Sequence, residues 1–299
     1  MSTKTNSPQS PARRVQDEIA DLERRLQEAK ARLNGNGDQN AVSGSRAPRL
    51  PTSDGPLSSS AHHFLLLLAD SALPLGSFAF SSGLESYLAH TRPASSFPEF
   101  LDFSLGSYAS TTLPFALAAH RNPMAIVELD DALDAAIMCA VGRRASVAQG
   151  RALLSIWDRS FSSAVIGGAS AEYVEALKEF TVLLRSASST ASSDLPAASA
   201  HLAPLFGAIA CISGMSLQQT AYVFMLSHVK ALLSAAVRAS IFGPYHAQKI
   251  LASVEVQEAI QRAITREWDT NIEDAGQTIP VMDLWIGRHE MLYSRIFNS

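Results

Sequence analysis

The sequence predicts an all-α protein: a single globular helical domain of about ten helices over residues 61–299, preceded by a disordered N-terminal extension. Three observations support this prediction. Hydrophobic residues make up 47% of the 299 residues and charged residues 17%, a composition that excludes wholesale disorder. Apolar residues recur at helical spacing in most segments, and no alternating strand of convincing length is present. No repeat of about 20–50 residues is visible, which disfavours a solenoid.

The N-terminal extension, residues 1–60, has a composition of its own. Gly, Pro, Ser and Asn dominate residues 34–60, as in a flexible tether that can bury almost nothing. Residues 14–33 are the exception, because apolar side chains recur there near the period of a coiled coil. That pattern lasts less than about three heptads, so a coiled-coil helix and a lone, marginal amphipathic helix both stay open for this segment.

The helices of the domain are expected in the following order. Helical spacing covers residues 64–69, 82–90, 97–118, 124–140, 144–161, 170–187, 200–213, 217–242, 246–268 and 281–294. Three of these helices begin with the pattern of a capping box, formed by Ser82 with Glu85, Ser96 with Glu99, and Ser216 with Gln219. The Ser-rich stretch 186–199 predicts an exposed loop between two helices.

Charge and targeting signals narrow the class of protein. The formal net charge is −4, which argues against a dedicated nucleic-acid binder, because such proteins need a basic stripe. The most apolar run, residues 221–242, contains His228, Lys230 and Arg238 and therefore fits a buried helix better than a membrane span. No signal peptide is visible, and the 2 cysteines cannot build a disulfide framework. A cytoplasmic protein that does not enter a membrane is expected.

The motifs of common catalytic and cofactor sites are missing from the sequence. It contains no phosphate-binding loop, dinucleotide fingerprint, C-x-x-C, H-E-x-x-H or G-x-S-x-G. Among the 8 histidines only His62 and His63 are adjacent, with no third ligand nearby. His228 fits a core imidazole with one satisfied nitrogen, and Cys139 and Cys211 fit buried, inert thiols. No catalytic residue, bound cofactor or resident metal is predicted.

Residues 70–88 form an unusual corner between two predicted helices. Pro74 ends the first helix, and Gly76 and Gly83 permit backbone torsions that other residues avoid. The two phenylalanines of this segment alternate across a short extended stretch. Either an aromatic plug closes the corner, or the corner is a fixed loop that presents a surface to a partner or lines a passage.

The C-terminal residues 283–299 crowd aromatic and apolar side chains into a chain end, together with Arg288 and Arg295. Chain ends fray unless they are docked, and Trp, Tyr, Met and Arg are enriched at the hot spots of interfaces. In a continuous helix, Leu284, Arg288, Met291 and Arg295 form one stripe. The segment is therefore either a terminal helix that packs on its own core or a docking segment for a partner.

Two residue patterns and three short blocks follow one another along the chain. The corner carries Pro74, Gly76, Ser77, Phe78, Ser81, Gly83, Leu84 and Glu85. The chain end carries Arg288, His289, Glu290, Tyr293, Ser294, Arg295, Ile296, Phe297 and Ser299. Between them lie blocks at residues 149–154, 206–207 and 234–238. In this order the five segments resemble the urease accessory protein UreF family over residues 64–299, although Phe80 stands where that family commonly has Tyr or His.

The resemblance implies an all-α, dimeric, non-catalytic chaperone. Members of that family bridge the accessory protein UreD, called UreH in some lineages, and the GTPase UreG, and the assembly delivers Ni²⁺ to the urease apoprotein. The GTPase binds the GTP, so no cofactor of this chain's own is implied. In the family the C-terminal segment orders on UreD, which implies a docking segment over 281–299. Its UreD/UreH-binding residues are then Arg288, His289, Glu290, Tyr293, Arg295, Ile296 and Phe297.

The resemblance also implies roles for other residues. A structural or interface loop is expected to contain Pro74, Gly76, Phe78, Phe80, Ser81, Gly83 and Glu85. Gln248 falls near the passage for nickel that is proposed for the family. Two other functions stay open: a generic helical adaptor recruited through residues 14–33, and an all-α small-molecule enzyme that uses Glu85, His90 and His120. An adaptor fails without residues 1–60, whereas a UreF-like scaffold still activates urease.

Overall fold

The computed structural model describes residues 24–25, 59–91, 96–165, 171–189 and 198–298. The chain divides into two units, Met1–Gly55 and Pro56–Ser299. Of the first unit only Arg24 and Arg25 are described, both in helical conformation. The predicted helix over 14–33 and the predicted extension over 1–60 therefore lie almost entirely outside the described residues. Residues 190–197 of the predicted loop at 186–199 also lie outside them, but its described ends differ from the prediction: residues 186–189 belong to the helix Ala171–Ser189, and Ala198 and Ser199 are buried.

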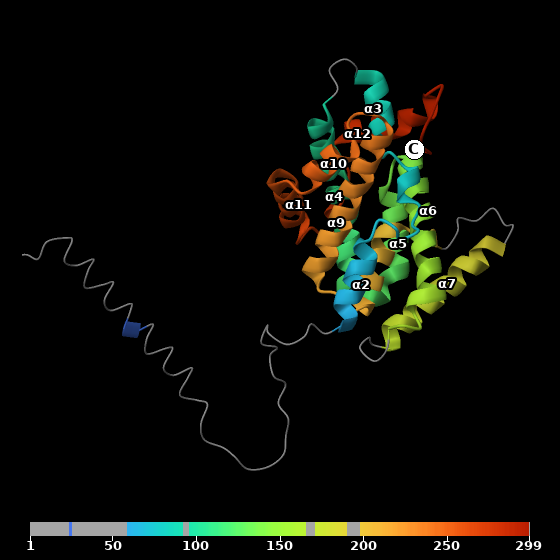
Figure 1. Ribbon diagram of the computed structural model, residues 1–299. Helices are drawn as coiled ribbons and strands as arrows, with labels where there is room; N and C mark the ends of the chain where they lie inside the picture. The colour runs from blue at the N-terminus through green and yellow to red at the C-terminus, as the bar shows by residue number, and fades with distance from the viewer. Residues whose placement is uncertain (1–23, 26–58, 92–95, 166–170, 190–197, 299) are drawn as a thin grey trace, which may run out of the picture. The chain divides into compact units, whose positions relative to one another are not determined.

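The described part of the second unit is built from helices joined by short turns, and none of its residues lies in a β-strand (Figure 1). This confirms the predicted all-α fold. The elements are α2 (Ser59–Ala69), η1 (Ser77–Ala79), α3 (Leu84–Thr91), α4 (Phe97–Arg121), η2 (Pro123–Ala125), α5 (Ile126–Ala136), α6 (Ala140–Ile156), η3 (Trp157–Phe161), α7 (Ala171–Ser189), α8 (Leu202–Ile212), α9 (Leu217–Arg238), α10 (Pro244–Leu251), α11 (Val254–Glu267), η4 (Ile272–Asp274), α12 (Pro280–Arg288) and η5 (His289–Met291).

Most predicted helices are present with shifted ends, but three local predictions are wrong. The predicted helix over 246–268 is two helices, because the Ser253 hydroxyl accepts the N–H of Val256 at 3.3 Å and so starts α11. The predicted helix over 281–294 ends as α12 at Arg288 and continues only as the single turn η5. The predicted extended stretch around Phe78 is also a helical turn, η1.

Of the three capping boxes predicted at helix starts, one is present in the structure. At α9 the Ser216 hydroxyl accepts the Gln219 N–H at 3.2 Å, and the Gln219 side chain accepts the Ser216 N–H at 2.9 Å. The other two predictions are wrong. The Ser96 side chain makes no capping hydrogen bond to the described residues of α4, and Ser82 precedes α3 with a φ of 50°. Glu85, its expected partner, binds a distant segment instead.

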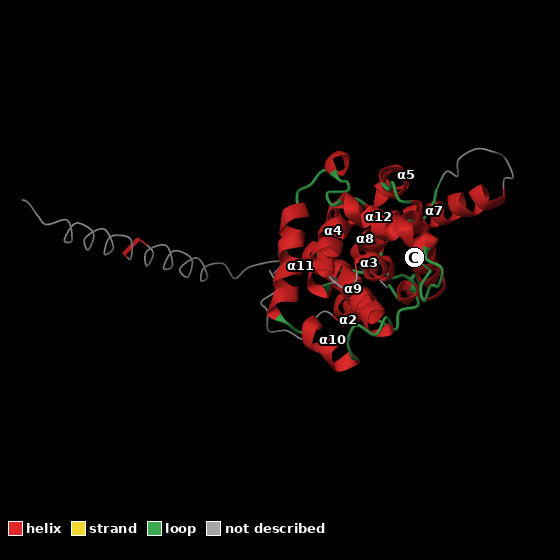
Figure 2. Ribbon diagram, turned by 90° about the horizontal axis from the view of Figure 1, so that it is seen from above, coloured by secondary structure: helices red, strands yellow, loops and turns green. Residues whose placement is uncertain are grey.

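α4 is the central helix of this unit, and it packs against α5, α8, α9 and α11 (Figure 2). Its approach to α8 is very close at Gly207, where an added Cβ would lie 2.0 Å from the carbonyl oxygen of Ala116. Backbone atoms on both sides leave no flexible group to move away. Only glycine therefore permits this crossing, which brings the two helix axes close together.

Pro114 lies inside α4 and does not end it. Proline has no backbone N–H, so the carbonyl of Ser110, four residues earlier, loses its partner within the helix. That carbonyl instead accepts the N–H of Gly276, at 3.0 Å, from the segment that precedes α12. A segment far away in the sequence thus supplies the donor that the proline removes, and buried backbone groups stay paired.

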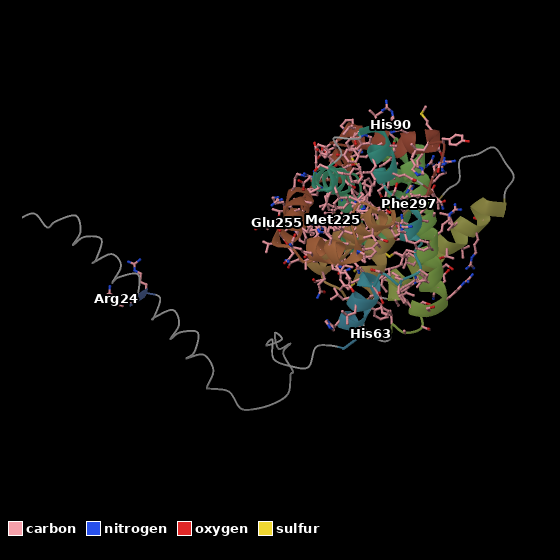
Figure 3. All side chains as sticks on the ribbon, turned by 45° about the horizontal axis from the view of Figure 1, so that its top comes forward. Arg24, His63, His90, Met225, Glu255 and Phe297 are labelled. Carbon is pink, nitrogen blue, oxygen red and sulfur yellow. The ribbon has the colours of Figure 1, made fainter. Side chains whose placement is uncertain are left out.

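Among the described residues, α9 is the helix whose length and composition would allow it to cross a membrane. However, 56% of its most apolar 18-residue window is buried inside this unit. Figure 3 shows Met225 of α9 within the mass of side chains, whereas Glu255 of α11 lies at its edge. α9 therefore packs as a core helix, as predicted for this apolar run.

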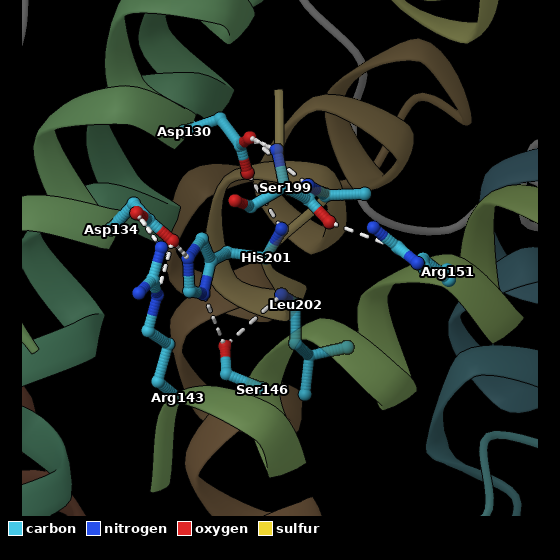
Figure 4. Close-up of polar contacts among 9 residues, drawn as sticks. Asp130, Asp134, Arg143, Ser146, Arg151, Ser199, His201 and Leu202 are labelled. Carbon is cyan, nitrogen blue, oxygen red and sulfur yellow. Dashed lines mark hydrogen bonds and ion pairs between the residues drawn. The ribbon is translucent and has the colours of Figure 1, made fainter. Parts of the chain in front are cut away.

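A buried polar network fixes the start of α8 (Figure 4). The Asp130 carboxylate, which is 1% exposed, accepts the backbone N–H groups of three consecutive residues. The distances are 2.7 Å to Ser199, 3.0 Å to Ala200 and 2.6 Å to His201. One buried carboxylate thus pairs three consecutive backbone N–H groups of the segment that leads into α8. The N–H of Leu202, the first residue of α8, donates to the Ser146 hydroxyl at 3.4 Å.

The His201 ring extends this network to two neighbouring helices. Its Nε2 lies 2.9 Å from Asp134 of α5, and its Nδ1 lies 3.0 Å from the Ser146 hydroxyl of α6. Arg143 of α6 pairs with the same Asp134 carboxylate. Burial raises the pKa of Asp134, but the hydrogen bonds from Arg143 and His201 outweigh it and hold that pKa below its usual value. The network thus ties α5, α6 and α8 together.

Candidate functional site

The tail (residues 289–298) meets one carboxylate at the start of α3, the helix that follows the corner loop (residues 70–83). Glu85, in the first turn of α3, has Oε2 2.9 Å from Nε2 of His289, which is 204 residues away in the sequence. Its two carboxylate oxygens also accept the backbone N–H groups of Ile296 at 2.7 Å and of Phe297 at 3.3 Å. The two segments that the sequence singled out therefore form a single site.

α12 carries the tail to this site and packs against α3 and α6. The Trp285 ring meets the ring of Tyr87 edge-on, with 4.7 Å between the centroids. Gly83 lies against α12, and a Cβ added there would be 3.1 Å from the backbone nitrogen of Ile286. Its φ of 87° is also one that favours glycine. Position 83 thus requires glycine for both its torsion and its close approach.

Phe297 anchors the end of the tail. Its side chain is 5% exposed, and the guanidinium of Arg238, at the end of α9, lies 4.4 Å from the centre of its ring. This distance is typical of a cation–π contact. Beside it, the N–H of Asn298 donates to the carbonyl of Ala79 in η1 at 2.8 Å. The corner loop, α3 and α9 together hold the tail.

The other side of the tail faces solvent, close to α3 and α6 (Figure 1). The exposed residues of the tail include Glu290, Met291, Tyr293, Ser294, Arg295 and Ile296, and Arg288 is exposed at the end of α12. Tyr293 is fully exposed and Met291 is 81% exposed. Glu290 pairs with Arg144 of α6 across the surface. The tail therefore combines buried anchors with an outward set of aromatic, apolar and cationic side chains.

A cavity of about 160 Å³ lies beside the corner loop and is bounded by α4, α6, α8, α9 and α12. Its wall is mainly apolar, with polar groups that include Tyr108, Gln149 and His228. Phe80 lines the cavity, whereas Phe78 is 66% exposed. The corner therefore does not hold a plug of two phenylalanines, because only one of the rings points inward.

His228 lies in the cavity wall as a neutral core imidazole. Its Nε2 is 2.9 Å from the Ser104 hydroxyl, and its ring stacks on Tyr108 with 3.9 Å between centroids. Burial lowers the pKa of His228 to about 3, since a charged imidazole is disfavoured away from water. The predicted core histidine with one satisfied nitrogen is confirmed.

The two cysteines are free thiols that are both partly exposed, so the prediction that they are buried is wrong. Cys139 precedes the first turn of α6 and lines the cavity. Partial burial raises the pKa of the Cys211 thiol above its usual value, which makes this thiol less reactive at neutral pH.

The described residues contain no group of three or more His, Cys, Asp or Glu side chains placed to hold a metal ion. The side chains considered for an enzyme have structural partners. Glu85 holds the tail, His90 Nδ1 lies 2.7 Å from the Ser86 carbonyl oxygen, and His120 Nε2 lies 2.9 Å from the Met215 carbonyl oxygen. These three residues do not converge on a common reactive site.

The structure brings some of the predicted site residues together and leaves others apart. Those in mutual contact around the Glu85 carboxylate are His289, Ile296 and Phe297. Ser81 is fully buried, Pro74 is exposed, and Gly76 has a φ of 73° that suits glycine. Gln248 lies exposed on α10 and does not line the cavity. Its role beside a passage stays a prediction.

Three residues at the site were missed by sequence reasoning: Arg144, Arg238 and Gln149. Gln149 accepts the Ser77 hydroxyl at 2.7 Å and so holds the corner loop on α6. Two of the three could have been found, because Gln149 and Arg238 fall within the blocks at 149–154 and 234–238. Arg144 carried no such signal, since its partner Glu290 lies 146 residues away.

The known proteins that this chain resembles include several named as urease accessory protein F or UreF-like. The family model described as UreF matches residues 91–255, from α4 to α10 but including neither the corner loop nor the tail. A Schizosaccharomyces pombe protein named "Uncharacterized urease accessory protein UreF-like" is 35% identical over 79% of this chain and 97% of its own length. Urease accessory protein F of Arabidopsis thaliana is 31% identical over 78% of this chain and 90% of its own length. Its counterpart in Oryza sativa subsp. japonica is 30% identical over 77% and 82%.

Proposed function

Because this chain belongs to the UreF family of urease accessory proteins, we propose that it serves urease maturation as a non-catalytic scaffold. In this proposal it holds a UreD/UreH-like accessory protein and a UreG-like GTPase together, and Ni²⁺ passes to the urease apoprotein as cargo. The GTPase binds GTP, so the chain uses no cofactor or resident metal of its own. It works in the cytoplasm as a homodimer.

The observation that carries this proposal is the two-sided tail. One side is fixed by Glu85 and by the buried ring of Phe297, while the other presents Met291, Tyr293 and Ile296 to water. Large apolar side chains that remain exposed on a held backbone are typical of a surface that a partner covers. The residue types are those enriched at interface hot spots.

The charges on the tail indicate what the partner surface must offer. Arg288 and Arg295 are exposed, and Glu290 is already paired with Arg144. The free charge on this side is therefore positive, and an apolar surface with acidic groups at its rim complements it. We assign this surface to the UreD/UreH-like partner and expect the GTPase to bind elsewhere on the scaffold.

The direct test is co-purification with UreD/UreH-like and UreG-like proteins, followed by activation of apo-urease with Ni²⁺, bicarbonate and GTP. Tyr293→Ala removes an exposed ring without touching the anchors, and a variant lacking residues 293–299 removes the whole docking end. Tyr245→Ala is the matched control, because Tyr245 is 91% exposed on α10. An interface tyrosine contributes about 2 kcal/mol when it is a hot spot, so we expect about a thirtyfold weaker complex for Tyr293→Ala.

Two results would contradict the proposal. If the chain lacking residues 293–299 still binds its UreD/UreH-like partner and activates urease fully, the tail is not the docking surface. If the purified chain turns over a small molecule without partners, it is not a non-catalytic scaffold. Activation that survives deletion of residues 1–60 excludes recruitment through that extension and supports the scaffold.

Two further parts of the proposal have separate tests. GTP turnover by the UreG-like protein, measured with and without this chain, tests whether the scaffold regulates its GTPase, and an unchanged rate removes that role. Light scattering of the purified chain tests the dimer. The expected mass is twice the 32.0 kDa of one chain, and a mass of one chain contradicts it.

A further inference from the structure

The cavity of about 160 Å³ beside the corner loop is a void between helices that otherwise pack closely. Protein interiors hold few voids larger than a water molecule. On α6, a Cβ added at Gly150 would lie 2.1 Å from the carbonyl oxygen of Ala200, and at Gly207 of α8 the corresponding distance to α4 is 2.0 Å. Loose packing of these helices therefore does not account for the cavity, and the chemistry of its wall indicates what it can hold.

One wall of the cavity is made of stacked aromatic rings. Tyr108 of α4 stacks on two residues of α9. Its ring centre is 3.9 Å from that of His228, with 4° between the planes, and 5.1 Å from that of Phe224, with 20° between the planes. All three residues line the cavity, as do Phe80 and Phe206. Because aromatic rings pack favourably against other aromatic rings, this wall suits a flat aromatic molecule.

Two hydroxyl groups of the wall lack a partner among the described residues. Ser107 of α4 lines the cavity and is 5% exposed, and the half-buried Ser227 of α9 lines it as well. Neither hydroxyl makes a hydrogen bond to a described residue, whereas the nearby Ser104 hydroxyl lies 2.9 Å from Nε2 of His228. Buried polar groups are normally paired. A molecule in the cavity that carries a hydrogen-bonding group supplies the missing partner.

The wall carries little charge. Of the described residues that line it, Asp283 alone is charged at neutral pH, and its carboxylate accepts the NH₂ group of Gln277 at 3.0 Å. His228 is neutral, because burial lowers its pKa to about 3. The described residues offer no group of three metal-binding side chains, and no lysine or arginine among the lining residues could pair with an anion. The wall therefore suits a neutral molecule and not an ion.

We propose that the cavity is a binding site for a small, neutral aromatic molecule with one hydrogen-bonding group, held by the stacked rings and by the Ser107 hydroxyl. Its size is that of a single ring, because an apolar cavity of about 150 Å³ takes up benzene. Met138 lines the cavity and is 84% exposed, so the ligand can enter from solvent. Glu85 and the tail do not line the cavity, and the site does not depend on the proposed function.

The binding experiment uses the purified full-length chain, with phenol, benzene and benzoate as probes. Methyl NMR of the methionines reports where a probe binds, because Met282 is buried in the cavity wall, whereas Met215 is buried elsewhere. We expect phenol to shift the Met282 methyl in a saturable way and to leave the Met215 methyl unchanged. Benzoate has the same ring with a negative charge and should cause no shift. Ser107→Ala should weaken phenol binding about fivefold, as expected for one hydrogen bond, and leave benzene binding unchanged.

A second pair of variants tests the place of binding. Ala145→Leu fills the cavity from α6, and Ala148→Leu is the matched control, because Ala148 is exposed on the same helix. Phenol binding should be lost in the first variant and kept in the second. The inference is overturned if neither phenol nor benzene shifts Met282 in a saturable way, which is the behaviour of a cavity that holds only water. It is also overturned if benzoate binds as tightly as phenol, or if Ala145→Leu or Ser107→Ala binds phenol as the wild-type chain does.

Discussion

Phe297→Ala should release the tail without unfolding the protein. The ring is 5% exposed, and burial of a phenylalanine side chain stabilises by about 2–3 kcal/mol. The Arg238 guanidinium, 4.4 Å from the ring centre, adds about 0.5–1 kcal/mol for a partly exposed pair. The variant therefore loses about 3 kcal/mol of docking free energy. Because the ring lies at the chain end, this loss acts on local opening of the tail and not on the core.

Hydrogen exchange measures that opening directly. The amides of residues 296, 297 and 298 all donate within the docked site, and alanine at position 297 keeps all three donors. A loss of about 3 kcal/mol predicts roughly a hundredfold faster exchange at these amides, with unchanged exchange in α4 and α8. Phe78→Ala, at a ring that is 66% exposed, is the control and should change neither. Exchange at wild-type rates in Phe297→Ala would refute the anchor role.

Three further predictions concern the core. Gly207→Ala forces a Cβ to 2.0 Å from the Ala116 carbonyl oxygen and should destabilise by about 3 kcal/mol in urea unfolding; an unchanged midpoint would contradict the α4–α8 crossing. Burial lowers the pKa of His228 from 6.5 to about 3 in the folded chain. The contribution of His228 to the free energy of unfolding is therefore fully present above pH 6.5, and the free energy of unfolding falls by about 1.4 kcal/mol per pH unit below it. The free energy of unfolding, measured at about pH 7 and about pH 5, should fall less in His228→Gln than in the wild-type chain. Equal falls in the two proteins would contradict a buried, neutral imidazole at position 228. Asp130→Asn should cost about 2–3 kcal/mol by leaving amides unpaired, whereas Asp131→Asn on the exposed face of α5 should not; equal melting temperatures would contradict the network.

Local chemistry was the part of the fold that the sequence predicted well. The helical period placed most helices, and the capping box at Ser216 and Gln219 formed as expected because both partners lie within one turn. The break at Ser253 was missed, since the apolar spacing runs through it without a glycine or proline. A serine that caps a new helix looks, in sequence, like a polar residue on an exposed face.

Long-range chemistry was the part that the sequence could not predict. Ser82 and Glu85 have the spacing of a capping box, but Glu85 binds residues more than 200 positions away. The predicted helix over 281–294 ends at Arg288, and the residues after η5 reach this carboxylate through the amides of Ile296 and Phe297. The two segments of the site were found by residue type and by resemblance. Their contact emerged only from the fold.

The hydrogen bond from Gly276 to the Ser110 carbonyl replaces the donor that Pro114 lacks, and it limits which residues suit position 276. The Ser110 carbonyl accepts the backbone N–H of residue 276, and no described atom lies within 4 Å of a Cβ built on that glycine. A Cβ therefore fits at position 276, whereas a proline there would remove the donor because it has no N–H to give. With Pro114 in place, a proline at position 276 would leave the Ser110 carbonyl without this donor, at a cost of about 1–3 kcal/mol.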